Sequence, residues 1–311
     1  MSQKIEIIHV TTVHPREDTR VFKKMCVDLA AEGYRVSLFV TDGLPSECKD
    51  SVEIRNLDRR RRLAARLIIS HFRVLLAILA NRNAVYHFHD PELVLLTPIL
   101  RLCGYKIILD FHEDTVEQIK EKHYVNPSFR KIISFGYLCI QNLGVRVASG
   151  LVFATPAIAQ SVGQNCKTPS ITVNNYVKVS EFPGVPSLGD YTQTKYFCYI
   201  GLISFDRCIS ELMDSLSHLD SEYRLVLAGK FESKSVEDFV LTHDNFSKVI
   251  YHGIVGRREF KVICQSSVCG VLLFKPLGNH VQSQPNKMWE YLVCNTRLVA
   301  TDFSYWADLL S

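Results

Sequence analysis

Two clusters of histidine and carboxylate side chains follow apolar runs of the sequence and could do chemistry together. The segment VYHFHDPEL (85–93) places His87 and His89 two residues apart. In a strand, side chains with this spacing share one face, so both should lie near the strand's carboxyl end on the same side. The next apolar run ends in DFHED (110–114), where His112 is followed by two acidic residues. These side chains could ligate a metal ion or form hydrogen bonds to sugar hydroxyls, and His87 could equally be a core histidine.

The loop after the first predicted strand, TTVHPREDTRVF (11–22), is polar and contains no glycine. Dinucleotide-binding enzymes and P-loop nucleotidases need glycine-rich turns that let the backbone approach a phosphate, so both classes are excluded. His14, Asp18 and Arg20 in this loop suit a ligand with hydroxyl or phosphate groups. Asp18 is also placed to cap the helix that follows.

In the second half of the chain, YIGLISFDRCISELMDSL (199–216) predicts a strand, a turn and a helix. Arg207 lies at the amino end of that helix, where a guanidinium beside free backbone N–H groups favours a diphosphate. An exposed arginine in a turn, without any ligand, explains this segment equally well.

A second helix start lies in QSQPNKMWEY (282–291). Pro285 opens the helix, Asn286 and Lys287 lie in its first turn, and Glu290 lies one turn later. A lysine in the first turn opposes the helix dipole, so an anionic ligand is the better explanation for it. We expect Glu290 to have no cation partner and to accept hydrogen bonds from two neighbouring hydroxyls, as a ribose offers.

Alternating strands and helices must position these residues. The predicted strands span 4–10, 35–41, 52–57, 84–89, 105–112, 150–155 and 170–175, and then 195–201, 223–229, 248–255, 268–274 and 297–302. Strands that are apolar on both faces belong to parallel sheets covered by helices, so the fold class is α/β with two Rossmann-like domains. In such sheets ligands bind beyond the carboxyl ends of the strands, which predicts a cleft between the domains.

The pattern predicts an amino-terminal domain over 1–180, a linker over 181–194 and a carboxyl-terminal domain over 195–311. The linker region contains prolines and glycines and lacks periodicity. The predicted helices of the second domain begin near residue 209 and span about 235–243, 257–266 and 286–294. This domain stops one element earlier than symmetry between the two domains suggests.

Composition narrows the function class. The 311 residues include 36 basic and 32 acidic side chains, and a net charge of +4 is too small for a nucleic-acid binder that works by bulk charge. Ten cysteines are scattered without a C-x-x-C motif, which excludes a zinc ribbon and is typical of free thiols in a reducing compartment. The sequence lacks a signal-peptide core and a run of 18 apolar residues. We therefore expect a cytoplasmic protein, at most peripheral to the inner face of the plasma membrane.

The local basic patch is RRRRLAARLIISHFRVLLAILANR (59–82), which predicts a long amphipathic helix. Its basic stripe consists of Arg62, Arg66 and Arg73, and its apolar stripe of Leu63, Leu67, Val74 and Ile78. Such a helix could lie on an anionic membrane surface. The slightly favoured alternative is that the apolar stripe packs on the sheet and the arginines are solvated.

Taken together, these segments resemble the GT-B glycosyltransferases, in particular the retaining family 4-like group that builds bacterial surface polysaccharides. The resemblance covers essentially the whole chain and rests on HPREDTR, HFHDP, DFHED, YIGLISFDR and PNKMWEYLVCNTRLVATD. It implies a GT-B architecture whose carboxyl-terminal domain binds a nucleotide-sugar. The implied acceptor is a glycan or a polyprenyl-linked sugar, and neither a metal nor another cofactor is implied.

The resemblance also implies roles for individual residues. The implied catalytic residues are His89, Arg207 and Lys287, of which the two cations face the donor diphosphate. The implied donor-binding residues are Gly201, Gln282, Asn286 and Glu290, with Glu290 on the ribose. The implied acceptor-side residues are His14, Asp18, Arg20 and His112.

Several positions depart from the family pattern. Gln282 replaces the first glutamate of the E-x7-E motif, Leu202 replaces an arginine, and Cys208 replaces a glycine. Asn295 replaces another glycine at a helix end, which is a mild change because asparagine tolerates left-handed backbone. Family members also continue further and end in a helix that returns to the first domain, so we expect a chain truncated at its carboxyl terminus.

Three functions fit these observations. The first is a glycosyltransferase of the hexosyltransferase type (EC 2.4). The second is a metal-dependent hydrolase that uses His87, His89 and His112, which leaves the second domain without a role. The third is a truncated glycosyltransferase fold that binds a nucleotide without turnover.

Overall fold

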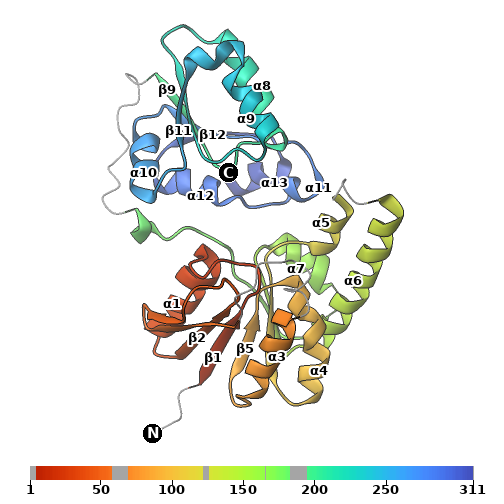
Figure 1. Cartoon of the computed structure of the whole chain (residues 1–311). Coiled ribbons are helices and arrows are strands. Elements are labelled where there is room, and N and C mark those ends of the chain that lie inside the picture. Colours follow the sequence, from red (N-terminus) through yellow and green to blue (C-terminus); the bar gives the residue numbers. More distant parts are fainter. Residues whose placement is uncertain (1–4, 58–68, 122–125, 165, 183–194, 311) are drawn as a thin grey trace. The chain divides into compact units, whose positions relative to one another are not determined.

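The computed structural model describes residues 5–57, 69–121, 126–164, 166–182 and 195–310. The chain divides into two compact units, Met1–Asn174 and Asn175–Ser311 (Figure 1). The division falls before the predicted boundary at residue 180, because the segment that follows Asn174 packs on the second unit. Tyr176, for example, lies edge-on against Trp289, with ring centroids 4.7 Å apart. Most of the predicted linker lies outside the described residues.

The amino-terminal unit is built on an eight-stranded sheet in the order β3-β4-β2-β1-β5-β6-β7-β8. Its strands are β1 (Glu6–Val10), β2 (Arg35–Val40), β3 (Glu47–Lys49), β4 (Val52–Asn56), β5 (Val85–Phe88), β6 (Lys106–Phe111), β7 (Gly150–Phe153) and β8 (Ser170–Thr172). Neighbouring strands are parallel except for the edge pair β3 and β4. Each strand predicted in this half is confirmed, and β3 is an addition that the sequence analysis missed.

Helices cover both faces of this sheet. They are η1 (Thr19–Cys26) with α1 (Val27–Ala31), α3 (His71–Leu79), η3 (Pro91–Leu96) with α4 (Thr97–Leu102), α5 (Thr115–Glu121), α6 (Pro127–Val147) and α7 (Pro156–Gly163). The crossovers from β4 to β8 all run in one direction across the sheet, so right-handed connections place α3, α4, α6 and α7 on one face. The crossover from β1 to β2 runs the other way and places η1 and α1 on the opposite face. Packing agrees, because Leu38 of β2 joins a core with Phe22 while the adjacent Phe39 joins the core of the other face.

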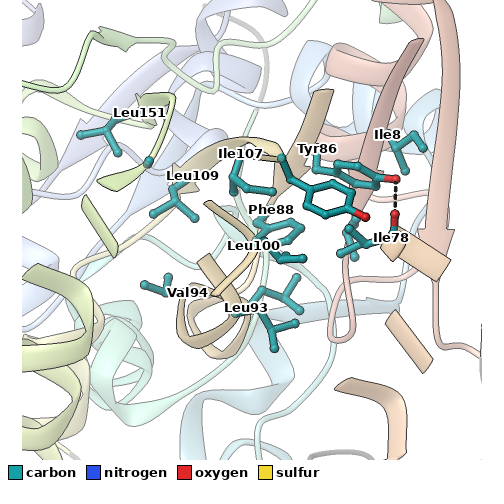
Figure 2. Close-up of a cluster of buried hydrophobic side chains, with 14 of the residues drawn as sticks. Ile8, Ile78, Tyr86, Phe88, Leu93, Val94, Leu100, Ile107, Leu109 and Leu151 are labelled. Atoms are coloured by element: carbon teal, nitrogen blue, oxygen red, sulfur yellow. Dashed lines mark hydrogen bonds between the residues drawn. The ribbon is translucent and has the colours of Figure 1, made fainter. Parts of the chain in front are cut away.

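The larger core lies between the sheet and the helices α3, α4 and α6 (Figure 2). Phe88 and Leu109 from the sheet pack there with Leu93 and Leu100, and none of the four is more than 1% exposed. Burying each of these side chains stabilises the fold by roughly 1.5–3 kcal/mol relative to leaving it in water. The phenol of Tyr86 is satisfied within this core, because its hydroxyl donates to the carbonyl oxygen of Ile78 at 3.1 Å.

The predicted amphipathic helix over 59–82 lies only partly within the described residues, where it forms α3. Val74 and Ile78 are fully buried against the sheet, as the packing interpretation of the apolar stripe requires. The residues Arg62, Leu63, Arg66 and Leu67 lie outside the described residues. Among the residues described, no helix combines the length and the apolar composition that crossing a bilayer requires.

The carboxyl-terminal unit has a five-stranded parallel sheet in the order β11-β10-β9-β12-β13. Its strands are β9 (Tyr196–Ile200), β10 (Arg224–Ala228), β11 (Val249–Gly253), β12 (Cys269–Leu272) and β13 (Arg297–Ala300). Its helices are η6 (Phe205–Arg207), α8 (Ile209–Ser215), η7 (Leu216–His218), α9 (Lys234–Leu241), η8 (Asp244–Lys248), α10 (Arg257–Gln265), α11 (Gly278–Val281), α12 (Asn286–Val293) and α13 (Ser304–Leu310). Tyr199 and Cys198, adjacent in β9, belong to two different cores, so this sheet is also packed on both faces. The strands and helices predicted for this half are confirmed.

Three backbone positions at the ends of strands and helices need special conformations. Gly229 follows β10, and a Cβ there would lie 1.7 Å from the carbonyl oxygen of Gly201, so no side chain fits. Cys208, at the start of α8, has a φ of 54°, in the left-handed region that glycine favours. Asn295, after α12, has a φ of 58°, which confirms the left-handed end expected there. Cys208 therefore holds a strained backbone next to the predicted diphosphate-binding arginine.

Replacing Cys208 with glycine should stabilise the protein. The left-handed conformation destabilises the folded state by about 1–2 kcal/mol when the residue has a side chain, and glycine removes this strain. Glycine also makes the unfolded chain more flexible, which lowers the free energy of unfolding by roughly 0.5–1 kcal/mol and offsets part of the gain. We expect a net gain of about 0.5–1 kcal/mol in the free energy of unfolding, measured by urea denaturation. Cys208→Ala is the control and should bring no gain. An equal gain from alanine would show that the thiol, and not the backbone, is unfavourable.

Candidate functional site

A buried carboxylate, Asp110 of β6, organises the polar rim of the amino-terminal sheet. Arg20 of η1 binds it through two nitrogen atoms at 2.8 and 3.2 Å, and Nε2 of His112 lies 2.8 Å from one of its oxygens. Burial alone would raise the pKa of Asp110, but His112, His89 and Arg20 outweigh burial and hold that pKa well below its usual range. Asp110 is therefore an ionised acceptor that fixes the side chains around it.

His89, which follows β5, lies behind this rim. Its Nδ1 is 3.0 Å from Asp110, and because an ionised carboxylate can only accept, Nδ1 carries the proton and Nε2 must accept. The donor to Nε2 is the Nδ1–H group of His9 in β1, at 2.8 Å. Both ring nitrogens of His89 are thus used inside the protein, and the residue is only 2% exposed. In this arrangement His89 links Asp110 to β1 and does not reach a surface where it could contact a sugar.

His87 and His9 extend the same buried histidine group. The ring centroids of His9 and His87 are 4.9 Å apart, and those of His87 and His89 are 4.5 Å apart. Burial and the neighbouring His89 lower the pKa of His87 to about 3, and burial also lowers the pKa values of His9 and His89. All three rings are therefore neutral at physiological pH. His87 fits the interpretation as a core histidine.

Two groups of side chains come close enough to be considered as metal ligands. His9, His87 and His89 form one, and His89, Asp110 and His112 form the other, with ligand atoms within 4.8 Å of one another in each. Both groups depend on His89, whose nitrogens already have protein partners. A catalytic metal also needs an open coordination position that water can reach, whereas the first three histidines are at most 7% exposed. The geometry gives no support to the hydrolase alternative.

The side chains that reach the surface at this rim are His14, Asp18 and His112. His14 is 28% exposed, lies 3.6 Å from Asp18, and has its ring centroid 5.0 Å from that of His112. The hydrogen bond to Asp18 raises the pKa of His14. Burial raises the pKa of Asp18, but His14 and the backbone N–H groups at the start of η1 lower it to about 2 overall. Of the four residues predicted to face an acceptor, these three are partly exposed and Arg20 is buried.

The loop after β1 is held by Asp90, a role that sequence reasoning missed. This carboxylate accepts from the hydroxyl groups of Thr11 and Thr12 at about 3.0 Å and from the backbone N–H of Thr12. Asp90 is 3% exposed, and Nε2 of His14 lies 3.5 Å from it. The sequence did contain a signal for this role. Asp90 follows one strand closely, and Thr11 and Thr12 directly follow β1, the strand beside it.

In the carboxyl-terminal unit, Arg207 and Lys287 approach the same backbone position. A Cβ built on Gly201, at the end of β9, would lie 3.5 Å from Nη1 of Arg207 and 3.9 Å from Cε of Lys287. The guanidinium of Arg207 also lies over the ring of Phe274, 4.9 Å from its centroid. Two cations thus converge on a strand end that carries no side chain, from helices that are far apart in sequence.

Glu290 does have cation partners, contrary to our expectation. Nζ of Lys287 lies 2.6 Å from one carboxylate oxygen, and Nη1 of Arg257 binds the other. Burial raises the pKa of Glu290, but Lys287 and Arg257 lower it more, so the side chain is ionised although only 3% exposed. Arg257 in turn pairs with Glu181 at 3.0 Å. Lys287 lies three residues away in the same helix, a local pairing that the expectation overlooked, whereas Arg257 comes from α10, more than thirty residues away in the chain.

Arg257 is a functional candidate that the sequence analysis did not identify. It is the first residue of α10, so it opposes a helix dipole in the same way as Lys287 does in α12. That signal was available in the sequence. The remaining predicted donor residues lie beside α12: Gln282 is exposed at the end of α11, and Asn286 is the first residue of α12.

No protein-family model matches the sequence, and no curated protein matches it by sequence search. Solved structures do match. Sucrose-phosphate synthase from Thermosynechococcus elongatus superposes with a TM-score of 0.71 over 96% of this chain and 82% of its own, at 13% identity. HepE from Anabaena in complex with UDP-glucose gives a TM-score of 0.65 over 99% and 83%, at 11% identity. The α,α-trehalose 6-phosphate synthase from Burkholderia multivorans gives 0.66 over 100% and 86%, at 12% identity.

The chain has the GT-B fold. The likeness extends over nearly the whole chain, so it includes both Rossmann-like units and not a single shared domain. At identities of 11–13% it establishes the fold, and the roles of individual residues rest on their geometry. Within this GT-B chain the two polar clusters belong to different units: the Asp110 network to the first, and the Gly201 site with its cations to the second.

The buried histidines should make the amino-terminal unit sensitive to acid. The pKa of His87 is about 3 in the folded protein against 6.5 normally, so unfolding takes up a proton between these values. Stability is therefore fully present above about pH 6.5 and falls as the pH drops, by about 1.4 kcal/mol per pH unit for each such group. His87→Leu should flatten the dependence on pH of urea denaturation followed by far-ultraviolet circular dichroism between pH 7 and 5.

The chain offers two controls for this experiment. His252→Leu removes a histidine whose side chain is 36% exposed and should leave the pH dependence unchanged. Both tryptophans, Trp289 and Trp306, lie in the carboxyl-terminal unit, so their fluorescence reports the unfolding of that unit. The contrary outcome is that His87→Leu shifts the unfolding transition seen by tryptophan fluorescence and leaves the pH dependence of the transition seen by circular dichroism as steep as before. In that case the buried histidines do not cause the acid sensitivity.

Proposed function

We propose that the protein is a retaining glycosyltransferase that takes a sugar from a nucleotide-sugar donor. The observation that carries the proposal is the convergence of Arg207 and Lys287 on Gly201. Within the described residues, Arg207 has no carboxylate at ion-pair distance, so its charge is available to an anion. The bare backbone of Gly201 lets a bulky anionic group approach closely. A diphosphate is the ligand that best matches two cations around such a strand end.

The same cations explain how transfer would be accelerated. When the bond between the sugar and the diphosphate breaks, the sugar becomes oxocarbenium-like and negative charge develops on the leaving phosphate. Arg207 and Lys287 would stabilise that charge without needing to reorganise, because both are already held in place. The two fixed positive charges would take the part that a divalent ion plays in other transferases. We therefore propose a reaction without metal or another cofactor.

Glu290 would bind the ribose of the donor. A carboxylate offers about four lone-pair positions, so the two cation contacts leave capacity for vicinal hydroxyls. Its ion pairs with Lys287 and Arg257 also fix its orientation. Gln282 and Asn286, on either side of this position, would complete the donor site. The structures of HepE with UDP-glucose and with UDP support a nucleotide-sugar as the class of donor.

The acceptor would meet the rim of the amino-terminal unit. His14, Asp18 and His112 offer exposed donors and acceptors that suit sugar hydroxyls. We propose a glycan or a polyprenyl-linked acceptor and a role in surface polysaccharide synthesis on the cytoplasmic side of the membrane. Binding of a nucleotide without turnover is the second candidate, because Gln282 replaces an acidic contact to the donor sugar. Release of free nucleoside diphosphate from the nucleotide-sugar over time separates the two candidates.

Removing either cation should weaken diphosphates much more than nucleosides. Charge-assisted hydrogen bonds contribute roughly 1.5–3 kcal/mol each, so Lys287→Ala and Arg207→Ala should each lower UDP affinity about ten- to a hundredfold. Uridine affinity should change little. The measurement is isothermal titration calorimetry in the presence of EDTA. Lys234→Ala, at an exposed lysine of the same unit, is the control, and an equal loss there would refute the assignment.

Glu290→Gln should separate ribose binding from phosphate binding. The change keeps the shape and removes the charge, so the affinity for UDP should fall about tenfold while that for pyrophosphate falls less. The melting temperature should also fall, because Lys287 and Arg257 lose their shared partner. Arg257→Gln breaks the same ion pair and serves as the control for that structural part. If both variants lose UDP and pyrophosphate affinity equally, Glu290 only positions the cations.

A further inference from the structure

The longest helix of the structure turns its apolar side to solvent. In α6, Phe129 is 65% exposed, Ile132 and Phe135 are each 68% exposed, and Leu143 is 51% exposed. The opposite side of the same helix is buried, with Gly144 in contact distance of Val94. An ordinary surface helix places polar residues on its solvent side. The exposed side of α6 therefore has a composition that water does not favour.

Two neighbouring helices repeat the pattern. In α3, Phe72, Leu76 and Leu79 are 60%, 50% and 48% exposed. Across η3 and α4, the exposed residues are Leu95 at 55%, Ile99 at 57% and Leu102 at 90%. In both cases the spacing is four and then three residues, which aligns the side chains in one stripe along the helix. Three helices thus each present an apolar stripe to solvent.

These stripes belong to one side of the amino-terminal unit. The right-handed crossovers place α3, α4 and α6 on the same face of the sheet, and their inner sides share one core (Figure 1). Their outer sides therefore face away from the sheet together. We call the exposed stripes of α3, η3–α4 and α6 the apolar face. Exposed apolar side chains gathered on one side of a protein mark a site of interaction with a membrane or a partner.

The charges on the helices of the apolar face indicate whether a second copy of the chain or a membrane binds there. The helices α3, α4 and α6 contain five basic residues, Arg73, Arg101, Arg130, Lys131 and Arg146, and no acidic residue; η3 adds one carboxylate, Glu92, which accepts from the hydroxyl of Thr12. Two copies of this chain packed face to face would bring these basic charges together, which disfavours a symmetric dimer. Anionic lipid headgroups complement basic side chains, and the acyl region accepts the apolar ones.

We propose that the apolar face docks the amino-terminal unit on the surface of an anionic membrane. Phe129, Ile132 and Phe135 enter the boundary between headgroups and acyl chains, and Arg130 and Lys131 contact the headgroups. The unit lies on the bilayer and does not cross it. This inference goes beyond the nucleotide-sugar proposal and does not depend on it, because the proposed donor residues belong to the other unit.

Vesicle flotation tests the docking directly. Vesicles of phosphatidylcholine with 30% phosphatidylglycerol, at about 0.1 M salt, should bind the whole protein, and pure phosphatidylcholine vesicles should bind it more weakly. Phe129→Ser/Ile132→Ser/Phe135→Ser should reduce binding at least about tenfold, since affinity scales with the apolar area that is buried. Arg130→Glu/Lys131→Glu should remove the preference for anionic vesicles. Both variants should keep the far-ultraviolet circular dichroism spectrum and the urea denaturation midpoint of the wild type, which checks that the amino-terminal unit still folds.

A matched triple variant provides the control. Leu241→Ser/Ile254→Ser/Val262→Ser removes three exposed apolar side chains from the carboxyl-terminal unit, and vesicle binding should persist. If the first triple variant binds vesicles as well as the wild type does, the proposal is wrong. It is also wrong if the wild type ignores anionic vesicles and forms a dimer in light scattering that the same substitutions dissolve. That result would assign the apolar face to a second copy of the chain.

Discussion

The ion pair between Asp110 and Arg20 is the constraint on which the polar rim of the amino-terminal unit depends. The side chains of Arg20 and Asp110 are 5% and 0% exposed, so each would be costly to bury alone, and removing one partner of such a pair costs about 3–5 kcal/mol. The pair ties β6 to η1, and Arg20 also donates to the backbone of Val173 after β8. Because Asp110 is ionised, it fixes the protons on His89 and His9 and positions His112 at the surface. One buried charge thus sets the orientation of four side chains from four elements.

The two units of the GT-B fold share an architecture but differ in the balance of charge at the carboxyl ends of their strands. In the first, the charges at the carboxyl ends of the strands are compensated inside the protein, and the remaining histidines are neutral because burial lowers their pKa values. Such a rim presents hydrogen-bonding groups with little net charge, which suits a hydroxylated ligand. In the second, Lys287 and Arg257 share the carboxylate of Glu290, Arg257 also pairs with Glu181, and Arg207 adds a third cation nearby at Gly201. That excess of positive charge suits an anionic ligand.

Much of this arrangement could be predicted from the sequence. Strands that are apolar on both faces predicted both sheets. A polar strand end predicted the position of His112, and cations at helix starts predicted the positions of Arg207 and Lys287. These signals are local, because they depend on the period of a strand and on the dipole of a helix. The long-range pairs could not be predicted in this way. His89 meets His9 across eighty residues, and Glu290 meets Arg257 across thirty-three. Which strands become neighbours decides those contacts, and a sequence motif describes one strand end at a time. The donor to His89 and the pairing of Arg257 with Glu290 were therefore missed.

The sequence analysis set no bounds for α6, and the weak amphipathic pattern of this helix has the same physical cause as the apolar face. Sequence reasoning recognises a surface helix by the contrast between an apolar side and a polar side. In α6 that contrast is weak, because Phe129, Ile132 and Phe135 lie on the exposed side while Val145 is buried on the other. A helix that is apolar all round is normally buried on all sides, yet in the described part of the chain α6 is covered mainly where it packs against α4, α5 and η3. The missing contrast therefore indicates a second apolar surface against the outer side of the helix. For a face whose helices carry five basic residues and one carboxylate, an anionic bilayer satisfies both requirements at once.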